Sequence, residues 1–147
     1  MSLVSIYYKN LLMRMQRGNH NGIFSNAKPI FMLAIINSIA KQNLKENHII
    51  LDELLVLEYK TLSKYYEPDK VITPIVKPYF HLSAEPFYEI KYKEGITTPK
   101  HSVTLSLKKL RNIVDDVKLD DGLWELLQKE NIRQEYSETI ITHFLNK

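Results

Sequence analysis

Cysteine is absent from this chain of 147 residues. Without cysteine there are no disulfides and no cysteine-ligated zinc sites, on which many small nucleic-acid-binding modules depend. The histidines also lack the spacing of metal ligands; they are His20, His48, His81, His101 and His143. We therefore expect no metal ion and no other cofactor. A chain without cysteine is typical of a reducing, intracellular location.

Long apolar runs are absent as well. The longest, IFMLAII at 30–36, is far shorter than the roughly 20 residues that a membrane-spanning helix needs. The N-terminus has neither the apolar core nor the cleavage site of a signal peptide. With 44% apolar residues and only four glycines, the composition is that of an ordinary globular protein. We expect one soluble, cytoplasmic domain over residues 1–147, with no membrane partner.

Acidic residues are missing from the first 28 positions, which carry four basic residues and a charge of +4. Residues 29–113 hold twelve basic and nine acidic residues, whereas residues 114–147 hold four basic and eight acidic residues. The first 113 residues therefore carry +7 and the remainder −4. A basic body with an acidic end suits a polyanionic partner such as DNA, although an unevenly charged solvated surface accounts for the same totals.

Apolar residues recur at helical spacing along much of the chain. A first helix is predicted to end at Gly18, before an asparagine- and glycine-rich loop, and a buried central helix is predicted to begin at Pro29. Further helices are predicted over 51–66, over 104–114, after Asp120 and Asp121, and from 132 to 144. The expected apolar faces of the first and third helices are Val4, Tyr7, Tyr8, Leu11, Leu12 and Met15, and Leu51, Leu54, Leu55, Tyr59, Leu62 and Tyr66.

The stretch KPYFHLSAEPFYEIKYK, residues 77–93, is rich in aromatic and basic residues. Phe80 and Leu82, and then Tyr88, Ile90 and Tyr92, alternate with more polar positions, as in a half-buried strand. We expect an antiparallel hairpin with an outer face of Tyr79, His81, Ser83, Phe87, Glu89, Lys91 and Lys93. The predicted fold is therefore α+β and mostly α, a helical domain with a small antiparallel β-hairpin sheet.

Three blocks, in this order, resemble a known family. KPIFMLAIINSI at 28–39, the stretch at 77–93, and LDDGLWELLQKENIRQEYSETIITHFL at 119–145 are similar to the domain that precedes the nuclease in HNH restriction endonucleases. In the McrA-like, phosphorothioate-dependent members this is the sulfur-binding domain, which recognises DNA with sulfur in its backbone. Nothing in the sequence resembles the HNH nuclease itself, so the resemblance implies a reader of DNA without the nuclease, either a standalone subunit that serves a nuclease or a divergent relative of the family.

The resemblance also implies a binding pocket. It would be built by the segment before the helix that starts with Lys-Pro and by the start of the Pro-aromatic-x-His-Leu segment. Carried over position by position, the pocket residues are Ser25, Asn26, Lys28, Lys77, Pro78, Tyr79 and His81. A proline ring and aromatic edges offer a dry wall to sulfur, while cationic and amide donors hold the phosphate oxygens.

A basic cluster follows this segment. Residues 91–113 carry a net charge of +5, with Glu94 as their one acidic residue. The candidate DNA-contacting residues here are Lys91, Lys93, Lys100, His101, Lys108, Lys109 and Arg111. Such a cluster would bind phosphates without regard to base sequence, and the affinity would fall as salt rises. A solvated helix and hairpin rim explain the same residues.

Two alternatives to a non-catalytic DNA-binding specificity domain stay open. Pro68-Asp69 followed by Glu89-x-Lys91 fits the order of a metal-dependent nuclease, in which two carboxylates hold Mg²⁺ and a lysine orients the attacking water. Alternatively, the aromatic face of the predicted hairpin docks another protein subunit. Salt-sensitive DNA binding distinguishes the first hypothesis from the last, and Mg²⁺-dependent nicking that is lost in Glu89→Ala identifies the nuclease.

Overall fold

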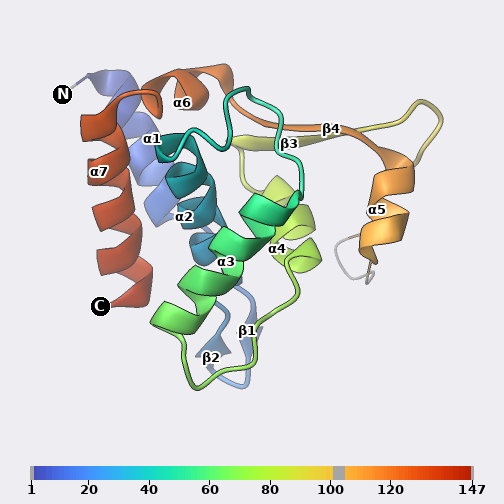
Figure 1. The fold of residues 1–147 in the computed structure, drawn as a ribbon, viewed down its shortest axis with the longest axis horizontal. Helices are drawn as coiled ribbons and strands as arrows, with labels where there is room; N and C mark the ends of the chain where they lie inside the picture. Colours follow the sequence, from blue (N-terminus) through green and yellow to red (C-terminus); the bar gives the residue numbers. More distant parts are fainter. Residues whose placement is uncertain (1, 101–104, 147) are drawn as a thin grey trace.

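The computed structural model describes residues 2–100 and 105–146. The fold is mainly helical, with two small antiparallel sheets of two strands each in the described ranges (Figure 1). This confirms the predicted α+β, mostly α class. In chain order the elements are α1 (Leu3–Met13), β1 (Asn19–His20), β2 (Ile23–Phe24), α2 (Ala27–Ala40), α3 (Glu53–Tyr66), α4 (Val76–His81), the 3₁₀ turn η1 (Leu82–Ala84), β3 (Tyr88–Tyr92), α5 (Leu107–Ile113), β4 (Val114–Leu119), α6 (Asp121–Leu126), α7 (Glu130–Ile140) and the π-helical turn η2 (Ile141–Leu145).

Helix α2 is the centre of the fold and is buried along nearly its whole length. A helix that is apolar on all sides is stable only when other elements surround it, and α3, α4 and α7 pack around α2 (Figure 1). The predicted central helix is confirmed. It begins at Ala27, two residues earlier than expected, because Pro29 lies in the first turn, where its missing N–H has no helical partner to lose. In the described part of the chain, no helix combines the length and apolar character that crossing a membrane requires.

Helix α1 packs against α6 and α7. Its start is capped by Ser2, whose hydroxyl accepts a hydrogen bond from the backbone of Ser5, and the Tyr136 hydroxyl on α7 donates to the Ser5 carbonyl at 2.6 Å. On α1 and on α3, the apolar face that contacts the core is narrower than the sequence predicts. Val4 and Tyr7 on α1 and Leu54 on α3 are exposed, so their assignment to the buried faces is wrong.

The hairpin predicted over 77–93 is also wrong. Its first half is helix α4 followed by η1, and only its second half, β3, is a strand. Proline is tolerated in the first turn of a helix, so Pro78 is compatible with α4. The buried residues of α4 and η1 are Pro78, Tyr79, Phe80 and Leu82. So short an apolar run is compatible with a helical turn as well as with a strand.

Strand β3 pairs in antiparallel register with β4, a segment that follows the predicted helix over 104–114 and was not predicted to be a strand. The predicted helix over 104–114 is shorter, and Val114 begins the strand instead. On β3, Tyr88 and Ile90 are buried whereas Glu89 and Lys91 are exposed, so the predicted alternation is confirmed for this half. In Figure 1 the β3–β4 sheet extends from the helical core toward α5, far from the β1–β2 hairpin.

Candidate nucleic-acid interface

A pocket of about 530 Å³ opens between the loop after α1, the start of α2 and helix α4. Five of the seven residues that the family resemblance implies line it: Ser25, Lys28, Lys77, Pro78 and His81. The other lining residues are Gln16, Arg17, Gly18, Ala27, Thr73 and Ala84. We call this the α2–α4 pocket. The fold therefore brings together most of the residues that the sequence pattern groups.

Lys28 and Glu85 form a buried ion pair at this pocket. Their Nζ and Oε2 atoms are 2.5 Å apart, and their side chains are 11% and 7% exposed. The same carboxylate oxygen accepts a hydrogen bond from the backbone N–H of Gln16 at 3.1 Å. Glu85 therefore matches the charge of Lys28 and also holds the loop after α1. Without this partner a lysine buried on the central helix would cost on the order of several kcal/mol.

Arg17 brings a second cation to the α2–α4 pocket. Its Nη1 donates to Oδ1 of Asn26 at 2.9 Å, and its guanidinium lies 4.6 Å from the ring centroid of Phe24 and 5.1 Å from that of Phe144. The Asn26 amide in turn donates to Glu67 at 3.3 Å. Asn26 therefore positions Arg17 from outside the lining of the pocket. The sequence-based prediction missed Arg17, although it lies in the acid-free first 28 residues.

Helix α4 presents Lys77, Pro78 and His81 to the α2–α4 pocket. Lys77 is exposed, Pro78 is buried, and His81 is half-buried with its ring edge-on to Phe80 at 5.2 Å between centroids. Since Glu85 already matches the charge of Lys28, the positive charge offered to a ligand comes from Arg17 and Lys77. Pro78, with the neighbouring alanines, adds an apolar wall. The pocket thus suits an anion that has one less polar side.

Tyr79 lies on the other side of α4. Its ring packs edge-on against Phe31 at 6.1 Å, and its hydroxyl donates to the carbonyl of Ile49 at 2.9 Å. Burial, followed by the charge of Asp116, raises the pKa of Tyr79 to about 12. Tyr79 is therefore a core residue. It does not line the α2–α4 pocket with Lys77, Pro78 and His81 as the resemblance implied, because residues 76–81 are helical and turn it inward.

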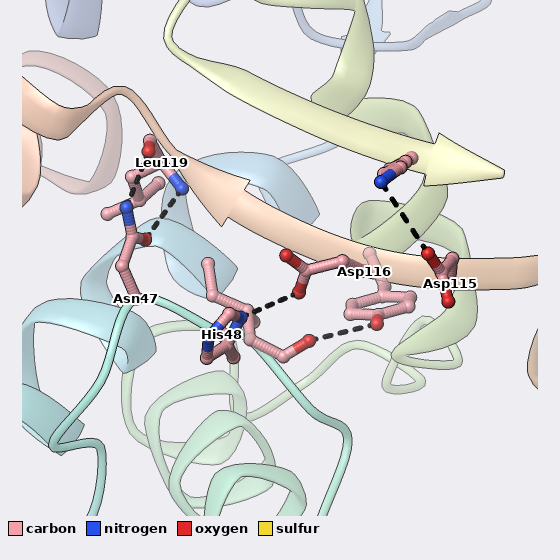
Figure 2. A network of polar contacts seen from close by, with 8 residues as sticks. Asn47, His48, Asp115, Asp116 and Leu119 are labelled. Carbon is pink, nitrogen blue, oxygen red and sulfur yellow. Dashed lines mark hydrogen bonds and ion pairs between the residues drawn. The ribbon is translucent and has the colours of Figure 1, made fainter.

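A second pocket, of about 400 Å³, lies between residues 48–51, α5 and β4. Figure 2 shows polar contacts beside this pocket. The Asn47 side chain makes hydrogen bonds with the N–H and the carbonyl of Leu119, at 2.9 and 2.7 Å, and the His48 Nδ1 lies 2.9 Å from Oδ1 of Asp116 (Figure 2). We call this the β4 pocket. Because α4 contributes Tyr79 to it and Lys77 to the α2–α4 pocket, the helix separates the two.

The predicted basic cluster lies near the β4 pocket. Its exposed members are Lys91, Lys93, Lys100, Lys108, Lys109 and Arg111, whereas His101 lies outside the described residues. Strand β4 places acidic residues beside this cluster. The Lys91 Nζ is 3.8 Å from Oδ2 of Asp115, and Asp116 is the cross-strand partner of Lys91. The charge of +5 counted over 91–113 therefore overstates the positive charge of this surface.

The residues of the alternative nuclease site lie apart. Asp69 is in the turn after α3, close to the β1–β2 hairpin, whereas Glu89 and Lys91 are on β3. Figure 1 shows this turn and β3 at opposite ends of the molecule. Among the residues that the structure describes, no cluster of three or more histidine, aspartate or glutamate side chains is arranged to hold a metal ion. The fold does not bring the three residues together.

The aromatic outer face expected for residues 77–93 does not exist. Phe87 is fully buried and Tyr79 is 7% exposed. Helix α4 places Tyr79 in the core, and the turn before β3 does the same for Phe87. The hypothesis of a protein-interaction module therefore loses the aromatic surface on which it rested.

No protein-family model matches the chain, and no curated protein matches it.

Proposed function

We propose that this chain is a non-catalytic DNA-binding specificity domain of a restriction or defence system. In this proposal the α2–α4 pocket takes one group of the DNA backbone, either a phosphate or its phosphorothioate form. Cleavage of the bound DNA would come from a separate nuclease subunit.

The observation that carries the proposal is the α2–α4 pocket itself. Besides Lys28, which pairs with Glu85, two cations line it, Arg17 and Lys77. The buried ring of Pro78 lies in the same lining. A planar guanidinium and a mobile ammonium are the groups that proteins use to hold phosphate oxygens. Asn26 and the rings of Phe24 and Phe144 hold Arg17 in place before any ligand arrives, which lowers the entropy lost on binding.

The apolar wall of the α2–α4 pocket is the reason to propose the phosphorothioate backbone as the preferred ligand. Sulfur is larger and more polarizable than oxygen and accepts hydrogen bonds weakly, so it gains from contact with Pro78 and Ala84. A phosphorothioate keeps the single negative charge of the backbone group, shared between its oxygen and its sulfur, and its oxygen stays a strong hydrogen-bond acceptor for Arg17 and Lys77. A pocket that has charge on one side and apolar atoms on the other therefore favours sulfur over oxygen.

A fluorescence-anisotropy titration tests the proposal. The protein is titrated into labelled duplexes with ordinary and with phosphorothioate backbones, at roughly 50 and 200 mM salt. We expect binding that weakens with salt and is tighter for the sulfur-containing duplex. Lys77→Ala should weaken binding to both duplexes and reduce the salt slope by about one.

Lys45→Ala is the matched control, because Lys45 is an equally exposed lysine that does not line the α2–α4 pocket. The affinity of this variant for each duplex should equal that of the unmodified protein. Absence of binding to either duplex at the lower salt concentration would overturn the proposed function. Equal affinity for the two duplexes would keep DNA binding and remove the preference for sulfur.

A further inference from the structure

The β1–β2 hairpin projects from the helical body (Figure 1), and its base adjoins the α2–α4 pocket. Strands β1 and β2 are joined by Asn21 and Gly22, whose φ angles of 54° and 83° are the left-handed values of a type I′ turn. The side chain of Asn19 accepts a hydrogen bond from the N–H of Gly22 at 2.9 Å and braces the turn. At the base, Ser25 N–H donates to the Gly18 carbonyl at 2.7 Å, and both residues line the pocket. The hairpin is thus a short, braced projection attached to the proposed phosphate site.

The two faces of the hairpin differ. Asn19 pairs with Phe24, and His20 pairs with Ile23, so Phe24 and Ile23 lie on opposite faces. The Phe24 ring lies under the guanidinium of Arg17, which identifies the face that looks toward the body of the protein. Ile23 is therefore on the outward face, where it is 66% exposed. A large aliphatic side chain exposed at the tip of a projection is available to a partner.

The shape and charge of the hairpin fit the major groove of DNA. That groove is about 12 Å wide and admits a two-stranded ribbon, whereas the minor groove is about half as wide. Residues 18–25 include no acidic side chain that would be repelled by phosphates. When a backbone group of DNA occupies the α2–α4 pocket, the adjoining hairpin would lie beside a groove of the same duplex. An uncharged tip suits base edges better than it suits phosphates.

We propose that the β1–β2 hairpin enters the major groove and reads A·T base pairs there. This inference rests on the proposed DNA-binding function and extends it from the backbone to the bases. Ile23 contacts the C5 methyl group of thymine, which only the major groove displays. The amide of Asn21 donates to N7 of adenine and accepts from its N6 amino group.

The thymine contact is tested with a mixed-sequence duplex and the same duplex in which uracil replaces every thymine, since this exchange removes only the methyl group. The unmodified protein should bind the uracil duplex about fourfold more weakly, the change expected from losing one buried methyl contact. Ile23→Ala should bind both duplexes equally. Leu57→Ala, which alters a 62% exposed aliphatic residue on α3, should keep the fourfold difference.

The adenine contact is tested with 7-deazaadenine, which lacks the N7 acceptor. The unmodified protein should bind the substituted duplex at least about fivefold more weakly. Asn21→Gly should lose this sensitivity. Glycine adopts positive φ without strain, so this variant removes the amide and keeps the turn.

Equal binding of thymine and uracil duplexes by the unmodified protein would overturn the inference, and so would a difference that persists in Ile23→Ala. If those duplexes still bind and Lys77→Ala still weakens the binding, the proposed function stands and only the role of the hairpin falls. If no duplex binds at the lower salt concentration, the proposed function and the inference fall together.

Discussion

The two sides of helix α4 differ in how their positive charge is matched. In the α2–α4 pocket, Lys28 is neutralised by the buried Glu85, while Arg17 and Lys77 lie where a ligand can reach them. On the side of the β4 pocket, Lys91 lies beside Asp115 and Asp116, which β4 brings from the acidic end of the chain. For this reason the proposed DNA-binding site is the α2–α4 pocket. The charge of a surface is decided by which segments pair in space.

The two sides are also held together by different forces. The loop beside the α2–α4 pocket is held mainly by side chains: Glu85 accepts from the N–H of Gln16, and Arg17 contacts Asn26 and two aromatic rings. The segment beside the β4 pocket is attached by backbone hydrogen bonds, including that from Ile49 N–H to the Val117 carbonyl at 2.7 Å, and by the Asn47 amide. Substitutions can therefore disturb one side while the other remains intact.

The largest effect is expected from Glu85→Ala, which leaves Lys28 buried without its partner. The free energy of unfolding should fall by about 3–5 kcal/mol, measured by urea denaturation. The double variant Lys28→Met, Glu85→Leu should recover most of this loss, because no buried charge remains. Lys70→Met is the matched control, since the Lys70 side chain is 52% exposed and its ion pair with Glu67 should contribute less than about 1 kcal/mol. A loss in Glu85→Ala as small as in the control would contradict the assigned role of the buried pair.

A smaller effect is expected at the other side of α4 when the pH rises. Burial, and then Asp116, raises the pKa of Tyr79 from 10.0 to about 12 in the folded state, whereas the unfolded chain ionises near the ordinary value. The stability that Tyr79 contributes is complete below pH 10 and is lost as the pH rises toward 12. Over that interval the loss should be about 2–3 kcal/mol for this tyrosine.

This alkaline loss is measured by urea denaturation of the unmodified protein and of Tyr79→Phe between pH 10 and 12. The variant lacks the ionising hydroxyl, so its stability should decline less steeply. Tyr8 and Tyr136, whose pKa values burial also raises to about 12, remain in both proteins and cause a common decline. An identical pH dependence of the two proteins would show that Tyr79 ionises as readily in the folded state as in the unfolded chain.

The smallest effect is expected from Lys91→Ala. Asp115 and Asp116 lie beside Lys91, so removal of this lysine should weaken DNA binding less than Lys77→Ala does. The expected loss of affinity is less than about twofold, which is within the free-energy range of an exposed ion pair. The measurement is the same anisotropy titration at the lower salt concentration. A larger loss in Lys91→Ala than in Lys77→Ala would move the DNA-binding surface to the β4 side of α4.

The sequence predicted elements whose identity depends on local composition. Helix α2 was predictable because a run of apolar residues follows Lys-Pro and continues for several turns. Helix α3 was predictable from its spacing and from Pro68 after its end. In contrast, PYFHL is too short for its periodicity to separate strand from helix, and its outcome depends on packing against α2. The partner of β3 was missed for a related reason, since strand pairing across a long connection leaves no local signal.

The candidate site shows the same division. The family pattern grouped five of the eleven residues that line the α2–α4 pocket, and four of the five belong to two helices, α2 and α4, that pack against each other in the core. It misplaced Tyr79, since the helical phase of α4 decides which side chains face the pocket. It missed Arg17, whose position depends on a hydrogen bond to Asn26 and on two aromatic rings, of which Phe144 lies at the far end of the sequence.

The narrow base of the β1–β2 hairpin has a consequence for how this protein can evolve. The hydrogen bond between Gly18 and Ser25 closes the projection at its neck, and the chain on either side continues into the core. Insertions, deletions and substitutions within 19–24 therefore leave the helical body unchanged, whereas most positions on α2 tolerate little change in size. Under the proposed function, new recognition preferences can arise at the tip without loss of folding.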